Sequence, residues 1–317
     1  MPSLKDVKAE NARYAPGYLP VAVFVGGTSG IGQGMAQAFA KHTNGNAHIV
    51  LVGRNEAAAD AILASFPTPT SPHAKHEFIQ SDISLMANVR ATATQLLASL
   101  PKINYLVLST GVMTLDGRTE TSEGIDKKLA VHYYARFKLT HELLPLLKKA
   151  EEEGEDAKAY SVFSPGYGGP IDVKDLGLKK TYSVRNAALQ GVSYMDAAYK
   201  EFAARHPSSR LTFTHAHPGG VDSGLLTNST SRPVRILQTC LGPIIRAAAP
   251  LIGIVSVEDA GEYQLYGMLQ QTGGLQRVGA RGQDIGMEAF YGGDEVVRRK
   301  VWQHSVRECR VEESKLA

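Results

Sequence analysis

The sequence predicts a single α/β domain in which helices cover both faces of a doubly wound parallel sheet. Two observations support this fold class. Short apolar runs alternate with stretches of helical periodicity from residue 21 to residue 215, and a glycine-rich turn joins the first run to the first helix. No linker rich in Gly, Ser or Pro and no internal repeat interrupts the chain, so one domain is favoured over two despite the length of 317 residues.

The elements follow in order from the spacing of apolar residues, which alternates in strands and recurs every three or four positions in helices. The expected strands are residues 21–25, 48–52, 76–79, 103–108, 159–163 and 211–215. The expected helices between them are residues 31–41, 56–66, 85–100, 122–153 and 184–205, and two further helices are expected at 256–269 and 294–310.

Composition excludes several functional classes. The 34 Lys and Arg residues nearly balance 31 Asp and Glu, and no basic run occurs, so a nucleic-acid partner is not expected. Two cysteines cannot form a disulfide framework, and the start MPSLKDVKAENARY lacks an apolar signal core, which favours the cytoplasm. The most apolar stretch, 233–257, is interrupted by Arg235, Arg246, Pro243 and Pro250, so no membrane span is expected.

A glycine-rich turn follows the first expected strand. Residues 26–32 read Gly-Gly-Thr-Ser-Gly-Ile-Gly and open the first expected helix. Glycines let the backbone approach a pyrophosphate, whose charge meets free N–H groups at the helix N-terminus. The predicted phosphate contacts are Gly26, Thr28, Ser29, Gly30, Ile31 and Gly32.

The next two strands end in residues that suit the adenosine half of a dinucleotide. Arg54 and Asn55 stand where an NAD site usually carries a carboxylate for the ribose, and a guanidinium there suits the 2′-phosphate of NADP(H). The alternative is a solvated arginine at a strand end. Asp82, followed by Ile83, can meet an adenine amino group, cap the helix beginning near Ser84, or do both.

Three further segments complete an ordered set of motifs. Ser109-Thr110-Gly111 follows the fourth strand, Ser161-Val162-Phe163-Ser164 ends the fifth, and His217-Pro218-Gly219-Gly220-Val221 follows the sixth. With the glycine turn, these motifs resemble the short-chain dehydrogenase/reductase family over residues 20–225, and residues 121–149 resemble the long helix of its retinol-dehydrogenase-like members. The resemblance implies a Rossmann-type fold, cofactor contacts at Thr110, Gly111, Pro218, Gly219 and Val221, and a substrate-binding serine at Ser164.

The resemblance also implies a division of the chain. A single NAD(P)-binding domain is expected over residues 18–317, after an N-terminal extension of residues 1–17. Within it we expect a nucleotide half over 20–112, a catalytic and substrate half over 113–225, and a C-terminal helical lid over 226–310. The long helix from Ser122 is where family members often pair, so a homo-oligomer is left open.

The family's catalytic Tyr-x-x-x-Lys pair is missing from its expected place. Counted back from residues 201–205, the tyrosine position holds Ala188 and the lysine position Val192, and a one-residue slip gives Leu189 and Ser193. The family's asparagine on the long helix corresponds to His132.

Other side chains can replace the missing proton donor. We hypothesise that Tyr182 or His132 supplies the proton, with Tyr167 as a third possibility. The alternative interpretation is that Tyr182 is a packing residue and His132 a hydrogen-bonded helix histidine.

The expected activity is therefore an NADP(H)-dependent oxidoreduction at a carbonyl or alcohol of a hydrophobic small molecule. The apolar stretch 225–257 either lines the substrate side or forms core or oligomer interface. The missing pair keeps two alternatives open, a redox-silent isomerase or cyclase and a non-catalytic nucleotide-binding protein. His215 and His217 share a strand face as metal ligands would, but no carboxylate or cysteine joins them at metal-site spacing, so no metal is expected.

Overall fold

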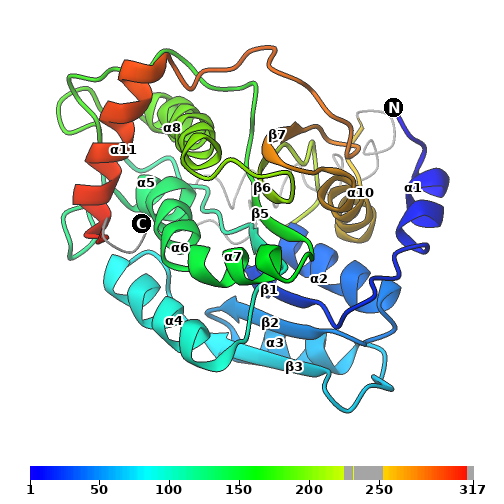
Figure 1. Cartoon of the computed structure of the whole chain (residues 1–317). Coiled ribbons are helices and arrows are strands. Elements are labelled where there is room, and N and C mark those ends of the chain that lie inside the picture. The colour runs from blue at the N-terminus through cyan, green and yellow to red at the C-terminus, as the bar shows by residue number, and fades with distance from the viewer. Residues whose placement is uncertain (225–230, 232–252, 313–317) are drawn as a thin grey trace.

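Seven parallel strands form one sheet in the part of the chain that the computed structural model describes, residues 1–224, 231 and 253–312 (Figure 1). Their order is β3-β2-β1-β4-β5-β6-β7. The strands are β1 (Val21–Val25), β2 (His48–Gly53), β3 (Lys75–Gln80), β4 (Tyr105–Leu108), β5 (Ala157–Val162), β6 (Leu211–Ala216) and β7 (Gly274–Val278). The predicted doubly wound Rossmann-type sheet in a single domain is confirmed.

Helices cover both faces of the sheet (Figure 1). One face carries α2 (Gly30–His42), α3 (Glu56–Ala64) and α10 (Val257–Gln270), and α1 (Leu4–Asn11) packs against α10. The other face carries α4 (Met86–Ser99), α6 (Ala135–Glu142), α7 (Leu144–Glu152), α8 (Val184–Arg205) and α11 (Glu295–Cys309).

The central strand β1 shows why this layered arrangement follows from the sequence. Val21, Val23 and Val25 enter the core beneath α4 to α8, whereas Ala22 and Phe24 enter the core beneath α2 and α10. Side chains on a strand alternate between faces, so a strand covered on both faces is apolar throughout. Strand β1 has the sequence Val-Ala-Val-Phe-Val and is accordingly apolar and buried at every position.

The predicted helix 122–153 is divided in the structure. It consists of α5 (Lys127–Leu129), a π-helical turn η1 (Ala130–Tyr134), α6 and α7. Pro145 stands in the first turn of α7, where a proline is tolerated. Within a continuous helix its ring would clash with the carbonyl four residues earlier, so α6 ends at Glu142. The prediction of one continuous helix was wrong at this proline.

Two elements lie outside the predicted set. Helix α1 begins with a capping box in which Ser3 and Asp6 bond each other's backbone N–H groups, a signal present in the sequence. Strand β7 reads Gly-Leu-Gln-Arg-Val and lacks an apolar pattern, and its pairing with β6 makes it a strand. The expected C-terminal lid therefore contains α10, β7 and α11, which over residues 257–309 form part of the sheet and of its helical layers. Most of the apolar stretch 225–257 lies outside the described residues.

Helices α2 and α10 touch through glycines. A Cβ built on Gly261 of α10 would lie 2.3 Å from the carbonyl carbon of Gly34 in α2, and one built on Gly34 would lie 2.2 Å from the carbonyl oxygen of Val257. These distances are far below van der Waals contact, so the two backbones can approach only because both positions lack side chains. The contact brings the C-terminal part of the chain against the glycine turn that opens α2.

We predict that Gly261→Ala destabilises the fold. The added methyl forces α2 and α10 apart, and overpacking of this kind costs about 1–3 kcal/mol. The unfolding free energy from urea titration should fall by that amount. Gly17→Ala is the control, because no atom lies within 4 Å of the place its Cβ would occupy, and its stability should change by less than about 0.5 kcal/mol. Equal stability of the two variants would contradict the close contact.

Candidate functional site

The turn between β1 and α2 forms a cradle that side chains would fill. Gly26 has φ +90° and Gly30 has φ +56°, backbone conformations that favour glycine. A Cβ on Gly26 would lie 2.8 Å from the Thr110 nitrogen, and one on Gly32 would lie 2.1 Å from Ser109 Oγ. The turn is therefore pressed against the end of β4, next to the point where the strand order reverses and where α/β sheets bind ligands.

The N-terminus of α2 lacks a side-chain cap. Ser29 stands at the N-cap with extended backbone, and its hydroxyl accepts no capping hydrogen bond. Uncapped N–H groups and the positive end of the helix dipole suit an anion. Thr28 belongs to this turn, and its side chain lies against Gly53 at the end of β2.

The segment after β6 reaches back to this turn. Gly219 has φ +72°, and Val221 forms a parallel bridge with Val255. A Cβ on Gly30 would lie 3.2 Å from the Cβ of Ser223. The structure therefore brings the predicted contacts Pro218, Gly219 and Val221 to the same edge as the glycine turn.

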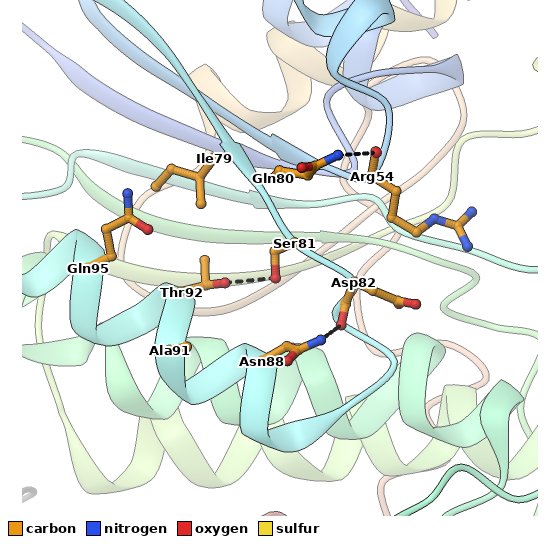
Figure 2. A pocket seen from close by; sticks show the side chains of 9 residues that line it. All are labelled: Arg54, Ile79, Gln80, Ser81, Asp82, Asn88, Ala91, Thr92 and Gln95. Atoms are coloured by element: carbon orange, nitrogen blue, oxygen red, sulfur yellow. Dashed lines mark hydrogen bonds between the residues drawn. The ribbon is translucent and has the colours of Figure 1, made fainter.

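Arg54 lines a hollow of about 470 Å³ at the carboxyl ends of β2 and β3 (Figure 2). The hollow is bounded by Arg54, Ile79, Gln80, Ser81, Asp82, Asn88, Ala91, Thr92 and Gln95. The Arg54 side chain is exposed, and the Arg54 backbone carbonyl accepts a hydrogen bond from Gln80 Nε2 at 3.2 Å. Among the described residues, no carboxylate forms an ion pair with its guanidinium, which leaves this cation available to an anionic ligand. Asn55 is engaged elsewhere, because its side chain caps α3 at Ala58 N.

Asp82 forms a local turn rather than the helix cap. Its Oδ1 accepts from Ser84 N at 3.0 Å, and its carbonyl accepts from Asn88 Nδ2 at 3.0 Å (Figure 2). The cap of α4 comes from a distant loop, where the Glu123 carboxylate accepts from Met86 N at 2.6 Å and Ala87 N at 2.9 Å. The Ile83 side chain is buried in the core, so only its backbone can face a ligand.

A buried arginine fixes the ends of β4 and β5. Arg136 donates from Nη2 to the Thr110 carbonyl at 2.5 Å and from Nη1 to Ser161 Oγ and the Val162 carbonyl, both at 2.7 Å. Burial lowers the pKa of this guanidinium to about 10, so it stays charged at neutral pH. Thr110 thus holds a defined position, and Gly111 after it is exposed.

Ser164 lies directly beyond β5. Its Oγ donates to the Phe163 carbonyl at 2.7 Å, and its backbone N–H donates to His215 Nε2 at 3.4 Å. The hydroxyl is half-buried and bonded only to a neutral group, so a substrate oxygen can compete for it at modest cost.

His132 lies in the π-helical turn and holds the loop after β4. Its Nε2 accepts a hydrogen bond from Val112 N at 3.0 Å, which assigns the ring proton to Nδ1. Burial, followed by the charges of Arg136 and Lys128, lowers the pKa of this imidazole to about 3. A neutral imidazole with an occupied Nε2 is poorly suited to donate a proton.

Tyr182 precedes α8 and packs against the larger core cluster. Burial, and then the Asp126 carboxylate, raise the pKa of its phenol above the ordinary value. The ammonium of Lys128 lies 5.6 Å from the centre of its ring. These surroundings match the packing alternative better than proton donation.

On α8 itself, the two positions at which the sequence comparison expected the Tyr-x-x-x-Lys pair hold an exposed Ala188 and a buried Val192. Ser193, the lysine position of the slipped alignment, is buried as well. Its Oγ contacts the N–H of Gly169 at 2.9 Å and the carbonyl of Gly169 at 2.6 Å. This face of α8 therefore anchors the 164–169 loop.

Tyr167 on that loop is the most exposed of the three tyrosine and histidine candidates, with 62% of its surface accessible. Its ring lies 4.7 Å from the His217 ring, centre to centre. Burial lowers the pKa of His217, so its imidazole is neutral near pH 7. Tyr167, His217 and Ser164 thus lie at adjacent strand ends.

Sequence reasoning missed the polar core behind Ser164. Asp196, in the middle of α8, accepts from His215 Nδ1 at 2.7 Å and lies 3.5 Å from Arg277 Nε of β7. A lone carboxylate within the apolar run from Tyr194 to Tyr199 was the available signal, because a buried charge needs a partner. His215 is therefore engaged with a carboxylate. No cluster of three or more metal-ligating side chains occurs in the part of the chain described here.

Known proteins resemble this chain in sequence. The family model for short chain dehydrogenases matches residues 20–161. Oxidoreductase AN1596 of Emericella nidulans is 36% identical over 84% of this chain and 76% of its own length. Oxidoreductase andH of Emericella variicolor is 30% identical over 84% and 74%. Mouse polyprenol dehydrogenase is 27% identical over 90% and 83%.

Solved structures share the fold. A 3-ketoacyl-(acyl-carrier-protein) reductase from Brucella melitensis, complexed with NADH, superposes with a TM-score of 0.57 at 22% identity over 83% of this chain and 98% of its own. An NADPH-bound carbonyl reductase from chicken fatty liver gives 0.56 at 17% identity over 84% and 98%. No helix among the described residues is both long and apolar enough to cross a membrane.

We predict that His132 stays neutral down to about pH 5. With a pKa lowered to about 3, its Cε1 proton NMR resonance should not move between pH 8 and pH 5. Because the unfolded chain binds this proton near pH 6.5, folding stability is full above that pH and is lost as the pH falls toward 3. In His132→Asn, the unfolding free energy should fall less steeply over this pH range, by up to about 1.4 kcal/mol per pH unit. A titration midpoint near pH 6 would contradict the assignment.

Proposed function

The chain belongs to the short-chain dehydrogenase/reductase family of oxidoreductases, and from this premise we propose that it uses NADP(H) to interconvert a carbonyl and an alcohol on a hydrophobic small molecule. The observation that carries the cofactor preference is the exposed Arg54 guanidinium at the rim of the hollow beyond β2 and β3. A planar cation without a carboxylate partner among the described residues suits a phosphate at the ribose 2′ position.

The residues present fit a dinucleotide along the carboxyl edge of the sheet. The cradle of Gly26 and Gly32 and the uncapped start of α2 would hold the pyrophosphate. Asp82 would face the adenine, while Thr110, Gly111 and the 218–221 segment would line the nicotinamide half. The bound cofactor supplies the hydride, and the chain supplies binding, orientation and a proton.

Exposed apolar side chains support a hydrophobic substrate. Met113 and Leu115 follow β4 and are 40% and 61% exposed, and Tyr167 follows β5. Met287, 51% exposed, belongs to a segment whose Tyr291 lies against Gly168. Large apolar side chains gathered on loops at one sheet edge are typical of a site for an apolar ligand. One relative is named for polyprenol, an apolar alcohol.

Ser164 is the proposed ligand of the substrate oxygen, and Tyr167 is the proposed proton donor. This revises the sequence-based assignment to Tyr182 or His132. His132 is held neutral with its Nε2 occupied, and the Tyr182 phenol is buried beside a carboxylate. Tyr167 is accessible, three residues from Ser164, and its ring lies against that of His217 in a tilted arrangement.

We predict that Arg54→Ala weakens NADPH binding about 10- to 100-fold and NADH binding less than threefold, since a phosphate–guanidinium contact contributes about 1.5–3 kcal/mol. Fluorescence of the reduced nicotinamide measures both dissociation constants. Arg210→Ala is the matched control, because Arg210 is an exposed arginine preceding β6 at the opposite sheet edge. Equal losses for both cofactors would contradict the 2′-phosphate assignment.

We predict that Ser164→Ala and Tyr167→Phe each lower kcat for an apolar ketone by about 10²-fold or more, as the loss of a positioned acid or oxygen ligand does. Tyr182→Phe should change kcat less than threefold. NADPH absorbance across a panel of apolar ketones gives the rates. Full activity of Tyr167→Phe alongside a large loss in Tyr182→Phe would restore the sequence-based assignment. Tight NADPH binding without turnover by the native chain would favour the redox-silent alternative.

A further inference from the structure

The buried Asp196 carboxylate is shared by three groups that come from different parts of the fold. Its Oδ1 accepts from His215 Nδ1 at 2.7 Å and lies 3.5 Å from Arg277 Nε, and its Oδ2 accepts from Tyr291 N at 3.3 Å. The side chains of Asp196, His215 and Arg277 are at most 1% exposed. A buried imidazole, a buried guanidinium and a backbone N–H group therefore face the same carboxylate.

The charges around His215 keep its ring neutral. Burial lowers the pKa of this imidazole most, Arg136 on α6 and Arg277 on β7 lower it further, and Asp196 on α8 opposes them. A neutral ring that donates from Nδ1 to Asp196 must present Nε2 as an acceptor. That acceptor faces the backbone N–H of Ser164 at 3.4 Å.

The end of β5 is therefore held from two sides. Arg136 binds the Ser161 hydroxyl and the Val162 carbonyl, and His215 receives the Ser164 N–H. The Arg136 contacts stop two residues short of Ser164, so among the side chains of the described residues His215 is the one that bonds the Ser164 backbone.

We propose that Asp196 and His215 are positioning residues that fix the Ser164 backbone, with Asp196 setting the tautomer of His215 and His215 holding the Ser164 N–H. This inference rests on the proposed role of Ser164 as ligand of the substrate oxygen. A displacement of about 1 Å at a reacting group can cost 10²-fold in rate, so a fixed Ser164 matters where the family's Tyr-x-x-x-Lys pair is absent.

A second buried carboxylate–histidine pair serves as the matched comparison. At the C-terminal end of α2, Glu262 of α10 accepts from His42 Nε2 at 2.9 Å, and both side chains are at most 6% exposed. This pair also binds Asn11 of α1, and it packs helices without contacting the 164–169 loop. Glu262→Gln therefore removes a buried carboxylate–histidine pair without touching the proposed positioning.

The test reads the tautomer and the Ser164 amide directly. In ¹⁵N-histidine-labelled native protein at pH 7.5, His215 should show a protonated Nδ1 and an unprotonated Nε2. An asparagine amide can replace Nδ1 as donor to Asp196 but cannot reach Ser164, whereas a glutamine carbonyl can replace Nε2 as acceptor. Hydrogen exchange at the Ser164 amide should therefore quicken about tenfold or more in His215→Asn and less than threefold in His215→Gln and Glu262→Gln, given a hydrogen bond of about 1 kcal/mol or more.

Turnover gives a second readout. With NADPH and an apolar ketone, His215→Asn should lower kcat about tenfold with the KM for NADPH within twofold, and His215→Gln should recover most of kcat. An Nε2-protonated His215, or equal Ser164 exchange in both variants, would overturn the proposal. If His215→Asn fails to fold, the tautomer in the native protein still decides. Absence of turnover in the native chain with the expected exchange pattern would contradict the proposed function and leave the positioning intact.

Discussion

The buried Asp196 carboxylate is the constraint on which the catalytic edge of this protein depends. A charge removed from water must be satisfied completely, and here the ring of His215, the guanidinium of Arg277 and the Tyr291 N–H share it. Arg277 donates in turn to the carbonyls of Gly286, Glu288 and Ala289. One carboxylate thus connects α8, β6, β7 and the 286–291 segment, and removing any partner would leave another buried polar group unpaired.

The two halves of the sheet edge are shaped by different physical means. At the nucleotide half, the absence of side chains defines the shape, because Gly26, Gly32 and Gly34 allow backbones to meet at distances that a Cβ would forbid. At the substrate half, buried cations and histidines fix the strand ends through hydrogen bonds. The first means suits a ligand held largely by backbone N–H groups, and the second suits side chains that must keep one orientation during a reaction.

The sequence was sufficient where the signal is local. Helix 184–205 begins and ends where its apolar spacing predicts, and the glycine turn and Arg54 lie at strand ends as expected. The polar network was not predictable, because Asp196, His215 and Arg277 are joined only by the folding of segments up to 81 positions apart, a separation that no periodicity records. Strand β7 escaped prediction because its neighbour β6, and not its own composition, makes it a strand. The choice of His132 and Tyr182 as donors rested on their expected place near the cleft, whereas burial and partners decide proton affinity.

We propose that this chain transfers a hydride although Ala188 and Val192 stand where the Tyr-x-x-x-Lys pair was expected from the sequence. The most direct measurement is a single-turnover reaction of the native protein with NADPH deuterated at nicotinamide C4 and an apolar ketone, followed by mass spectrometry of the product. The account predicts an alcohol with one deuterium on the former carbonyl carbon, formed from one face of the cofactor only. Saturating NADPH binding with no deuterium transfer to any ketone of the panel would contradict it.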